Sequence, residues 1–100
     1  MIKVKVCKND SIYKKIELLG HAMYDDYGKD IVCAAVSSIA TTTVNGILAL
    51  NKNSLSYMVS KKGLSIDIKN TDETTQILIG NMVSLLKELE VNYPENIEVK

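Results

Sequence analysis

Residues 30–50 read DIVCAAVSSIATTTVNGILAL, and this stretch decides what kind of fold the chain can form. Its large apolar residues recur at spacings of three and four, the period of a helix with a buried face. They are Val32, Val36, Ile39, Val44, Ile47 and Leu48. The spacing predicts a helix from Asp30 to about Leu50, with Asp30 as N-cap because its carboxylate can accept from first-turn amides. A helix this apolar needs cover on two sides, from its own chain or from a dimer partner.

On both sides of this helix, apolar and polar residues alternate, which is the pattern of half-buried strands. Two such stretches come first, at residues 2–6 and 15–19, with the turn formers Asn9-Asp10-Ser11 between them. Two more follow the helix and flank the turn Lys61-Lys62-Gly63. Residues 21–29 have no clean period, so we expect them to form an exposed loop.

A second helix is predicted after Asn70, which has capping-box spacing to Glu73. Its apolar face would contain Leu78, Met82, Leu85, Leu86 and Leu89. Pro94 should end this helix, and Ile97 and Val99 could form a short last strand. The whole pattern predicts one α+β domain, residues 1–100, in the order ββαββα(β). Both helices should cover one face of a mostly antiparallel sheet.

The composition argues against several classes of function. The chain has 100 residues with 12 basic and 12 acidic side chains, and all the basic ones are lysine. A neutral chain without arginine is a poor candidate for reading nucleic acid. We expect no membrane-spanning segment and no signal peptide, hence a cytoplasmic protein with Cys7 and Cys33 reduced. One histidine and two cysteines are too few for a four-ligand zinc site, and we expect no cofactor.

The candidate chemistry lies in His21 and Cys33. His21 is the only histidine and opens the predicted loop, while Cys33 would lie in the first turn of the long helix. Unpaired amides and the helix dipole at that position would favour a thiolate, and the Cys33 amide could hold an oxyanion. A thiolate beside an imidazole is a recurrent nucleophile. Gly28 could act as a loop hinge.

Other residues could take part in such a site. Tyr24 and Tyr27 could pack on a substrate, and a polar stripe on the helix could face a cleft. This stripe, at steps of four, consists of Ser37, Thr41 and Asn45. Each feature also has a purely structural interpretation: Cys33 as a small core residue, His21 on the surface, Asp30 as a cap only, and Ser37 as a packing residue. Cys7, on the lysine face of the first strand, is interpreted as structural or exposed.

Two segments resemble the ribosomal-processing cysteine protease family, Prp. They are Gly20-His21-Ala22 and residues 27–37, YGKDIVCAAVS. They match the family's Gly-His pair, Gly-x-Asp, hydrophobic pair, Cys-Ala and a serine four residues after the cysteine. The resemblance implies His21 as general base and Cys33 as nucleophile, with Asp30 and Ser37 as supporting residues and Gly20 and Gly28 shaping a mobile loop.

The resemblance also implies a substrate. Members of the family are bacterial, cytosolic homodimers that remove the N-terminal extension of a large-subunit ribosomal protein of the L27 type. The cleaved sequence is rich in Leu and Phe, and the cut follows an aromatic residue. Two other interpretations stay open at this point: a non-catalytic peptide-binding module for ribosomal components, and another thiol hydrolase such as a thioesterase.

Overall fold

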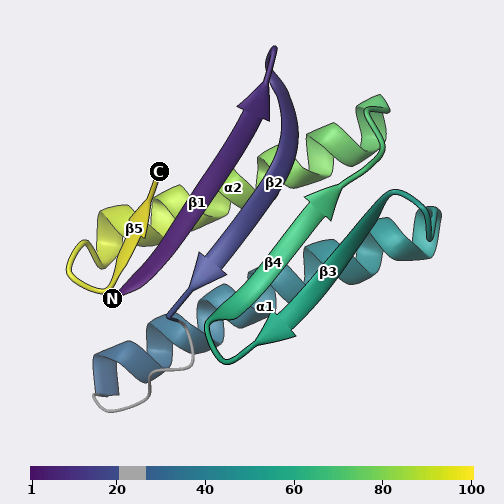
Figure 1. Cartoon of the computed structure of the whole chain (residues 1–100). Helices are drawn as coiled ribbons and strands as arrows, with labels where there is room; N and C mark the ends of the chain where they lie inside the picture. The colour runs from purple at the N-terminus through teal and green to yellow at the C-terminus, as the bar shows by residue number, and fades with distance from the viewer. Residues whose placement is uncertain (21–26) are drawn as a thin grey trace.

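The sheet carries both helices on one of its faces. The computed structural model describes the backbone of residues 1–20 and 27–100, and the side chains of residues 1–20 and 31–100. The elements in chain order are β1 (Ile2–Asn9), β2 (Ile12–Leu19), α1 (Tyr27–Leu50), β3 (Leu55–Ser60), β4 (Gly63–Ile68), α2 (Glu73–Asn92) and β5 (Ile97–Val99) (Figure 1). This confirms the α+β class and the predicted order, the optional last strand included.

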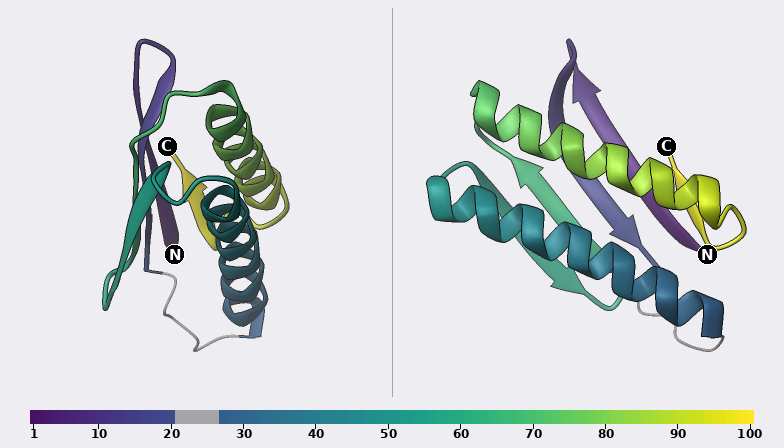
Figure 2. Two further views of the ribbon diagram at one scale, coloured as in Figure 1. Left: turned by 90° about the vertical axis from the view of Figure 1, so that its right-hand side faces the viewer. Right: turned by 180° about the vertical axis from the view of Figure 1, so that it is seen from behind.

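The five strands are arranged in the order β3-β4-β2-β1-β5. All neighbours are antiparallel except β1 and β5, which are parallel. Both helices lie on the same face of this sheet, α1 towards β3 and β4, and α2 towards β1 and β5 (Figure 2). β3 is therefore one edge of the sheet and lies on the side that α1 covers.

Strand alternation places the core between the sheet and the helices. Ile2 and Val4 of β1 and Ile16 and Leu18 of β2 are buried on the helix side, while Lys3 and Lys5 are exposed on the other. α1 contributes a buried row at helical spacing. That row consists of Val32, Val36, Ala40, Val44 and Ile47. The periodicities that predicted these elements thus also identified most of their buried faces, although Ile39 and Leu48 of α1 are only partly buried.

The start of α1 differs from the prediction. The helix begins at Tyr27, so Asp30 lies inside it and cannot be its N-cap. Residues 27–29 are helical rather than part of an exposed loop. Tyr-Gly-Lys carries no apolar period and contains a poor helix former, which is why the periodicity did not reveal this first turn.

α2 also begins differently from the prediction. Its N-cap is Asp72, which makes no side-chain capping bond. Asn70 instead forms a local turn, because its Oδ1 accepts a bond from the Asp72 amide at 3.0 Å. The capping box predicted for Asn70 and Glu73 is therefore wrong. The helix ends before Pro94 as predicted, although Leu85 is 38% exposed and lies at the margin of the buried face.

Two further expectations about α1 differ from the structure. By length and composition, Ile31–Leu50 is apolar enough to cross a membrane, contrary to our expectation that no segment would be. In this fold the segment packs one row of side chains on the sheet, and 28% of its apolar window is buried. The opposite face of the helix is exposed, so the described part of the chain, residues 1–20 and 27–100, does not wrap the helix on all sides. The exposed outer row contains Ala34, Ser38, Thr42 and Ala49.

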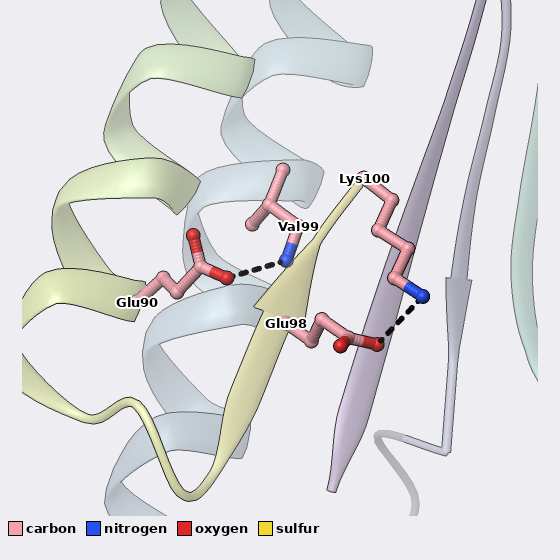
Figure 3. Close-up of polar contacts among 4 residues, drawn as sticks. All are labelled: Glu90, Glu98, Val99 and Lys100. Atoms are coloured by element: carbon pink, nitrogen blue, oxygen red, sulfur yellow. Dashed lines mark hydrogen bonds and ion pairs between the residues drawn. The ribbon is translucent and has the colours of Figure 1, made fainter.

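The C-terminal strand is attached to two elements. The Lys100 amide donates to the Val4 carbonyl at 2.8 Å, which continues the parallel pairing with β1. The Val99 amide donates to Glu90 Oε2 of α2 at 3.0 Å (Figure 3). The nearby Lys100–Glu98 ion pair is 3.8 Å long and exposed, so it contributes little to stability. The two hydrogen bonds connect β5 to both layers.

Candidate active site

Cys33 lies within α1 rather than at its start. It is the seventh residue of a helix that begins at Tyr27, which places it about 9 Å along the helix axis. Only the first four amides of an α-helix lack an intrahelical acceptor. The Cys33 amide is beyond them, so it is not available as an oxyanion donor, and the helix dipole acts weakly at this distance. The prediction of a first-turn cysteine is therefore wrong.

The Cys33 side chain lies at the boundary of the core. It is half-buried and packs against the buried apolar cluster. It is neither enclosed in the hydrocarbon interior nor fully exposed, and a thiol at such a boundary can meet a substrate that approaches from solvent. Cys7 is exposed and follows the alternation of Lys3 and Lys5, so it lies on the sheet face that carries no helix. This agrees with the prediction of an exposed residue, and no disulfide joins Cys7 to Cys33.

Gly20 determines how the chain leaves β2 immediately before His21. Its φ is +79°, and a β-carbon there would lie 3.0 Å from the Met1 carbonyl oxygen. Its amide donates to the carbonyl of Lys62, in the β3–β4 turn, at 2.8 Å. The left-handed conformation and the close backbone approach both favour glycine. Gly20 thus attaches the His21 segment to the end of the sheet where the β3–β4 turn lies.

Several predicted site residues lie outside what the structure describes. His21 and Tyr24 fall in residues 21–26, and the side chains of Tyr27 and Asp30 are likewise outside the described set. Gly28, predicted as a loop hinge, is the second residue of α1. The catalytic roles of His21 and Cys33, and the supporting roles of Asp30 and Ser37, therefore stay predictions.

The described part of the chain contains an apolar groove of about 350 Å³ between α1 and the sheet. Its floor and inner wall are mostly aliphatic, and its rim on α1 is polar. The aliphatic and aromatic residues are Leu18, Val36, Ala40, Val44, Tyr57, Val59 and Leu64, and the polar ones are Ser37, Thr41 and Asn45. The predicted polar stripe thus lines a groove. Cys33 precedes Ser37 by one helical turn, at the end of this row.

The groove contains residues that were missed in the sequence. Tyr57 and Val59 were recognised as strand residues, but their position opposite α1 depends on the sheet order. The one signal available in the sequence was that Tyr57 and Val59 are large apolar residues at alternate positions, which is the pattern of a strand face that contacts other apolar groups. Among the described residues, no three His, Cys, Asp or Glu side chains converge on a metal site.

Comparison with known proteins assigns the chain to a class and a family. A family model described as cysteine protease Prp matches residues 1–98. A Staphylococcus aureus protein named ribosomal processing cysteine protease Prp is 30% identical, with 99% of this chain and 97% of that protein covered. A Mycoplasma genitalium protein of the same name is 31% identical, with coverage of 99% and 94%.

Solved structures agree over the whole chain. A crystal structure of the essential ribosomal processing protease Prp from S. aureus, in complex with a substrate peptide, has a TM-score of 0.91 and 29% identity, covering 100% of this chain and 98% of that one. The same S. aureus protein with a covalently linked product peptide has a TM-score of 0.88 at 29% identity and the same coverage. The fold and these matches define a cysteine protease. The chain belongs to the Prp family.

Proposed function

We propose that this chain is a cysteine endopeptidase that removes the N-terminal extension of a bacterial large-subunit ribosomal protein of the L27 type. The observation that carries the proposal is the family match over residues 1–98, which contains both candidate catalytic residues. Relatives covering nearly all of this chain are named ribosomal processing proteases. The cut would follow an aromatic residue in a segment rich in Leu and Phe.

Cys33 is the proposed nucleophile and His21 the proposed base. His21 takes the proton of the thiol, and the sulfur attacks the scissile carbonyl. The tetrahedral intermediate collapses as the imidazolium protonates the leaving amine, which departs as the mature N-terminus. Water, deprotonated by His21, then hydrolyses the thioester and regenerates the thiol. The half-buried position of Cys33 at the boundary of the core supports this role. A covalently linked product peptide in the S. aureus relative also agrees with it.

Four further residues would support this pair. Ser37 lines the groove one turn after Cys33 and would contact the substrate near the cut. Asp30 and Gly28 lie in the first turn of α1 and would help to position the segment that carries His21. Gly20 would do the same from the other side, because its positive φ and its bond to the Lys62 carbonyl define where that segment begins.

We also propose that the protein acts as a homodimer in the cytoplasm. The exposed outer face of α1 supports the dimer, because its row of small residues allows a second helix to approach closely. A substitution of Ser38→Arg, in the middle of this row, should convert a dimer to a monomer in multi-angle light scattering. The matched change Ser84→Arg, on the exposed part of α2, should leave the mass unchanged. A monomeric wild-type protein would contradict this part of the proposal.

A peptide assay tests the proposed activity. A synthetic peptide with a Leu- and Phe-rich ribosomal extension and the first residues of the mature protein is incubated with the full chain, and the products are weighed by mass spectrometry. We expect one cut, after an aromatic residue, and none in a scrambled peptide of the same composition. His21→Ala should lower the rate strongly, by roughly a hundredfold or more.

The same assay separates the two rival functions. A peptide-binding module would bind the peptide without producing fragments. A thioesterase would hydrolyse an acyl thioester and leave the peptide intact. Either result would contradict the proposed function, while a single cut after an aromatic residue excludes both.

A further inference from the structure

The outer edge of β3 adjoins the groove, because Tyr57 and Val59 of this edge strand line it. We propose that the substrate adds to β3 as an extra strand, with every second side chain pointing into the groove between α1 and the sheet. This inference rests on the proposed function, because the occupant is the peptide substrate itself: an extended segment rich in Leu and Phe.

The first observation is the open edge. β3 ends the strand order, so within residues 1–20 and 27–100 only β4 pairs with it. Tyr57 is 53% exposed and Val59 is 70% exposed, although both point to the helix side of the sheet. An edge strand with exposed apolar residues readily pairs with another extended segment. No proline or bulge interrupts β3 to block such pairing.

The second observation is the register of the β3–β4 hairpin. Ser60 and Gly63 flank its two-residue turn and pair with each other, which makes them a hydrogen-bonded pair. Such pairs alternate along an antiparallel ladder, so Val59 and Tyr57 belong to non-hydrogen-bonded pairs. The bond from the Lys69 amide to the Ser54 carbonyl, 2.8 Å long, fits this alternation. The amide and carbonyl groups of Tyr57 and Val59 therefore point outward, towards the open edge.

The third observation is the match between strand and helix spacing. Side chains on one face of a strand are about 6.6 Å apart. Ser37, Thr41 and Asn45 follow each other at intervals of about 6 Å along the rim that α1 contributes. Alternate side chains of an added strand would thus meet successive steps of this rim. From Ser37 to Asn45 the rim extends about 12 Å, which accommodates two or three alternate side chains.

The direction of the peptide follows from the position of Cys33. β3 runs opposite to α1, so its Ser60 end lies towards the half of α1 that contains Cys33 (Figure 1; Figure 2, right). In the proposed function, the apolar residues precede the scissile bond. A peptide that places them in the groove and its scissile bond at Cys33 must therefore run parallel to β3. Its first groove residue lies nearest Asn45 and its last nearest Ser37.

Backbone methylation of the substrate tests the added strand directly. Single N-methyl groups are introduced one at a time in the peptide, at least two residues before the scissile bond, and kcat and KM are measured with the wild-type chain. We expect KM to rise by about tenfold or more at every second position, where the amide bonds to β3, and to change little between. A uniform response, or none, would overturn the proposal.

Two pairs of variants test the enzyme side. Val59→Pro removes an outward amide without removing a ladder bond to β4, so it should raise KM well above the value for Val59→Ala. Asn45→Trp fills the far end of the groove and should raise KM for peptides with large apolar residues there. The matched Asn81→Trp, on an exposed position of α2 outside the groove, should not. Circular dichroism establishes that each variant is folded.

The outcomes distinguish this inference from the function on which it rests. Cleavage that persists with unchanged KM in both Val59→Pro and Asn45→Trp overturns the added strand and leaves the protease intact. A change of mass from dimer to monomer in Val59→Pro would show that a second copy of the chain occupies the edge, which also overturns it. If wild-type protein does not cut the peptide at all, the proposed function itself fails.

Discussion

Replacement of Cys33 by alanine should reduce kcat/KM for the ribosomal extension peptide by at least about a thousandfold. Alanine leaves no atom that can attack the scissile carbonyl, and water alone cannot form the thioester through which the reaction is proposed to pass. Cys33 is half-buried and small, so its loss should cost little stability, and the folded variant can be assayed directly. The measurement is the initial rate of fragment formation by liquid chromatography and mass spectrometry.

Cys7 is the matched control for this prediction. It is the only other cysteine, it is exposed, and it lies on the face of the sheet opposite the helices. Cys7→Ala should keep kcat/KM within about twofold of wild type, because Cys7 lies on the sheet face opposite the groove and a surface substitution there should hardly change stability. Activity that survives in Cys33→Ala, or disappears in Cys7→Ala, would contradict the assignment of the nucleophile.

Substitution of Gly63 by alanine should destabilise the fold strongly, although it adds only one methyl group. Gly63 has a φ of +139°, and its β-carbon would overlap the Leu18 carbonyl oxygen and lie 3.1 Å from Leu19 Cα. These are backbone atoms of β2, so no side chain can move aside. We expect a loss of about 2–4 kcal/mol in the free energy of unfolding, from backbone strain and disrupted β2–β4 pairing.

Gly46→Ala provides the opposite expectation with the same chemical change. Gly46 lies inside α1, and a β-carbon there would meet nothing within 4 Å. Alanine in a helix interior should stabilise by about 0.5–1 kcal/mol, because glycine loses more backbone entropy on folding. Urea denaturation followed by circular dichroism measures both variants. Similar free energies for the two would show that β4 does not approach β2 closely at Gly63.

The strands and helices were predictable because each has one face that must be buried. Alternation at Ile2 and Val4 and the three-four spacing from Val32 onward identified both the elements and their inner faces. The parallel pairing of β5 with β1 was not predictable, since it depends on α2 returning the chain to the far edge. The first turn of α1 was missed because Tyr27 and Gly28 carry neither an apolar period nor a strong helix preference.

The candidate site was predictable only in part, because one wall of the groove depends on how the elements are arranged in space. The motif indicated Cys33 as the candidate nucleophile. Spacing at steps of four predicted the polar row that begins at Ser37, and this row lines a groove in the structure. The other wall of the groove is formed by Tyr57 and Val59 of β3. Their place opposite α1 could not be predicted, because it depends on the order of the strands in the sheet. The electrostatic argument for a first-turn thiolate also failed, because it depended on where α1 begins. The proposed activation of Cys33 therefore relies on the proposed base, His21, and not on helix-start amides.

Detection of the acyl-enzyme would show which of the two cysteines is the nucleophile. Wild-type protein is mixed with the extension peptide, quenched in acid within the first turnovers and digested with trypsin at mildly acidic pH. Because trypsin cuts after lysine, Cys7 falls in residues 6–8 and Cys33 in residues 30–52, so the two thiols lie in separate fragments. We predict that the fragment of residues 30–52 gains the mass of the acylated N-terminal product, with the modification on Cys33. The same mass gain on residues 6–8 would contradict the account, as would its absence from both fragments while cleavage proceeds.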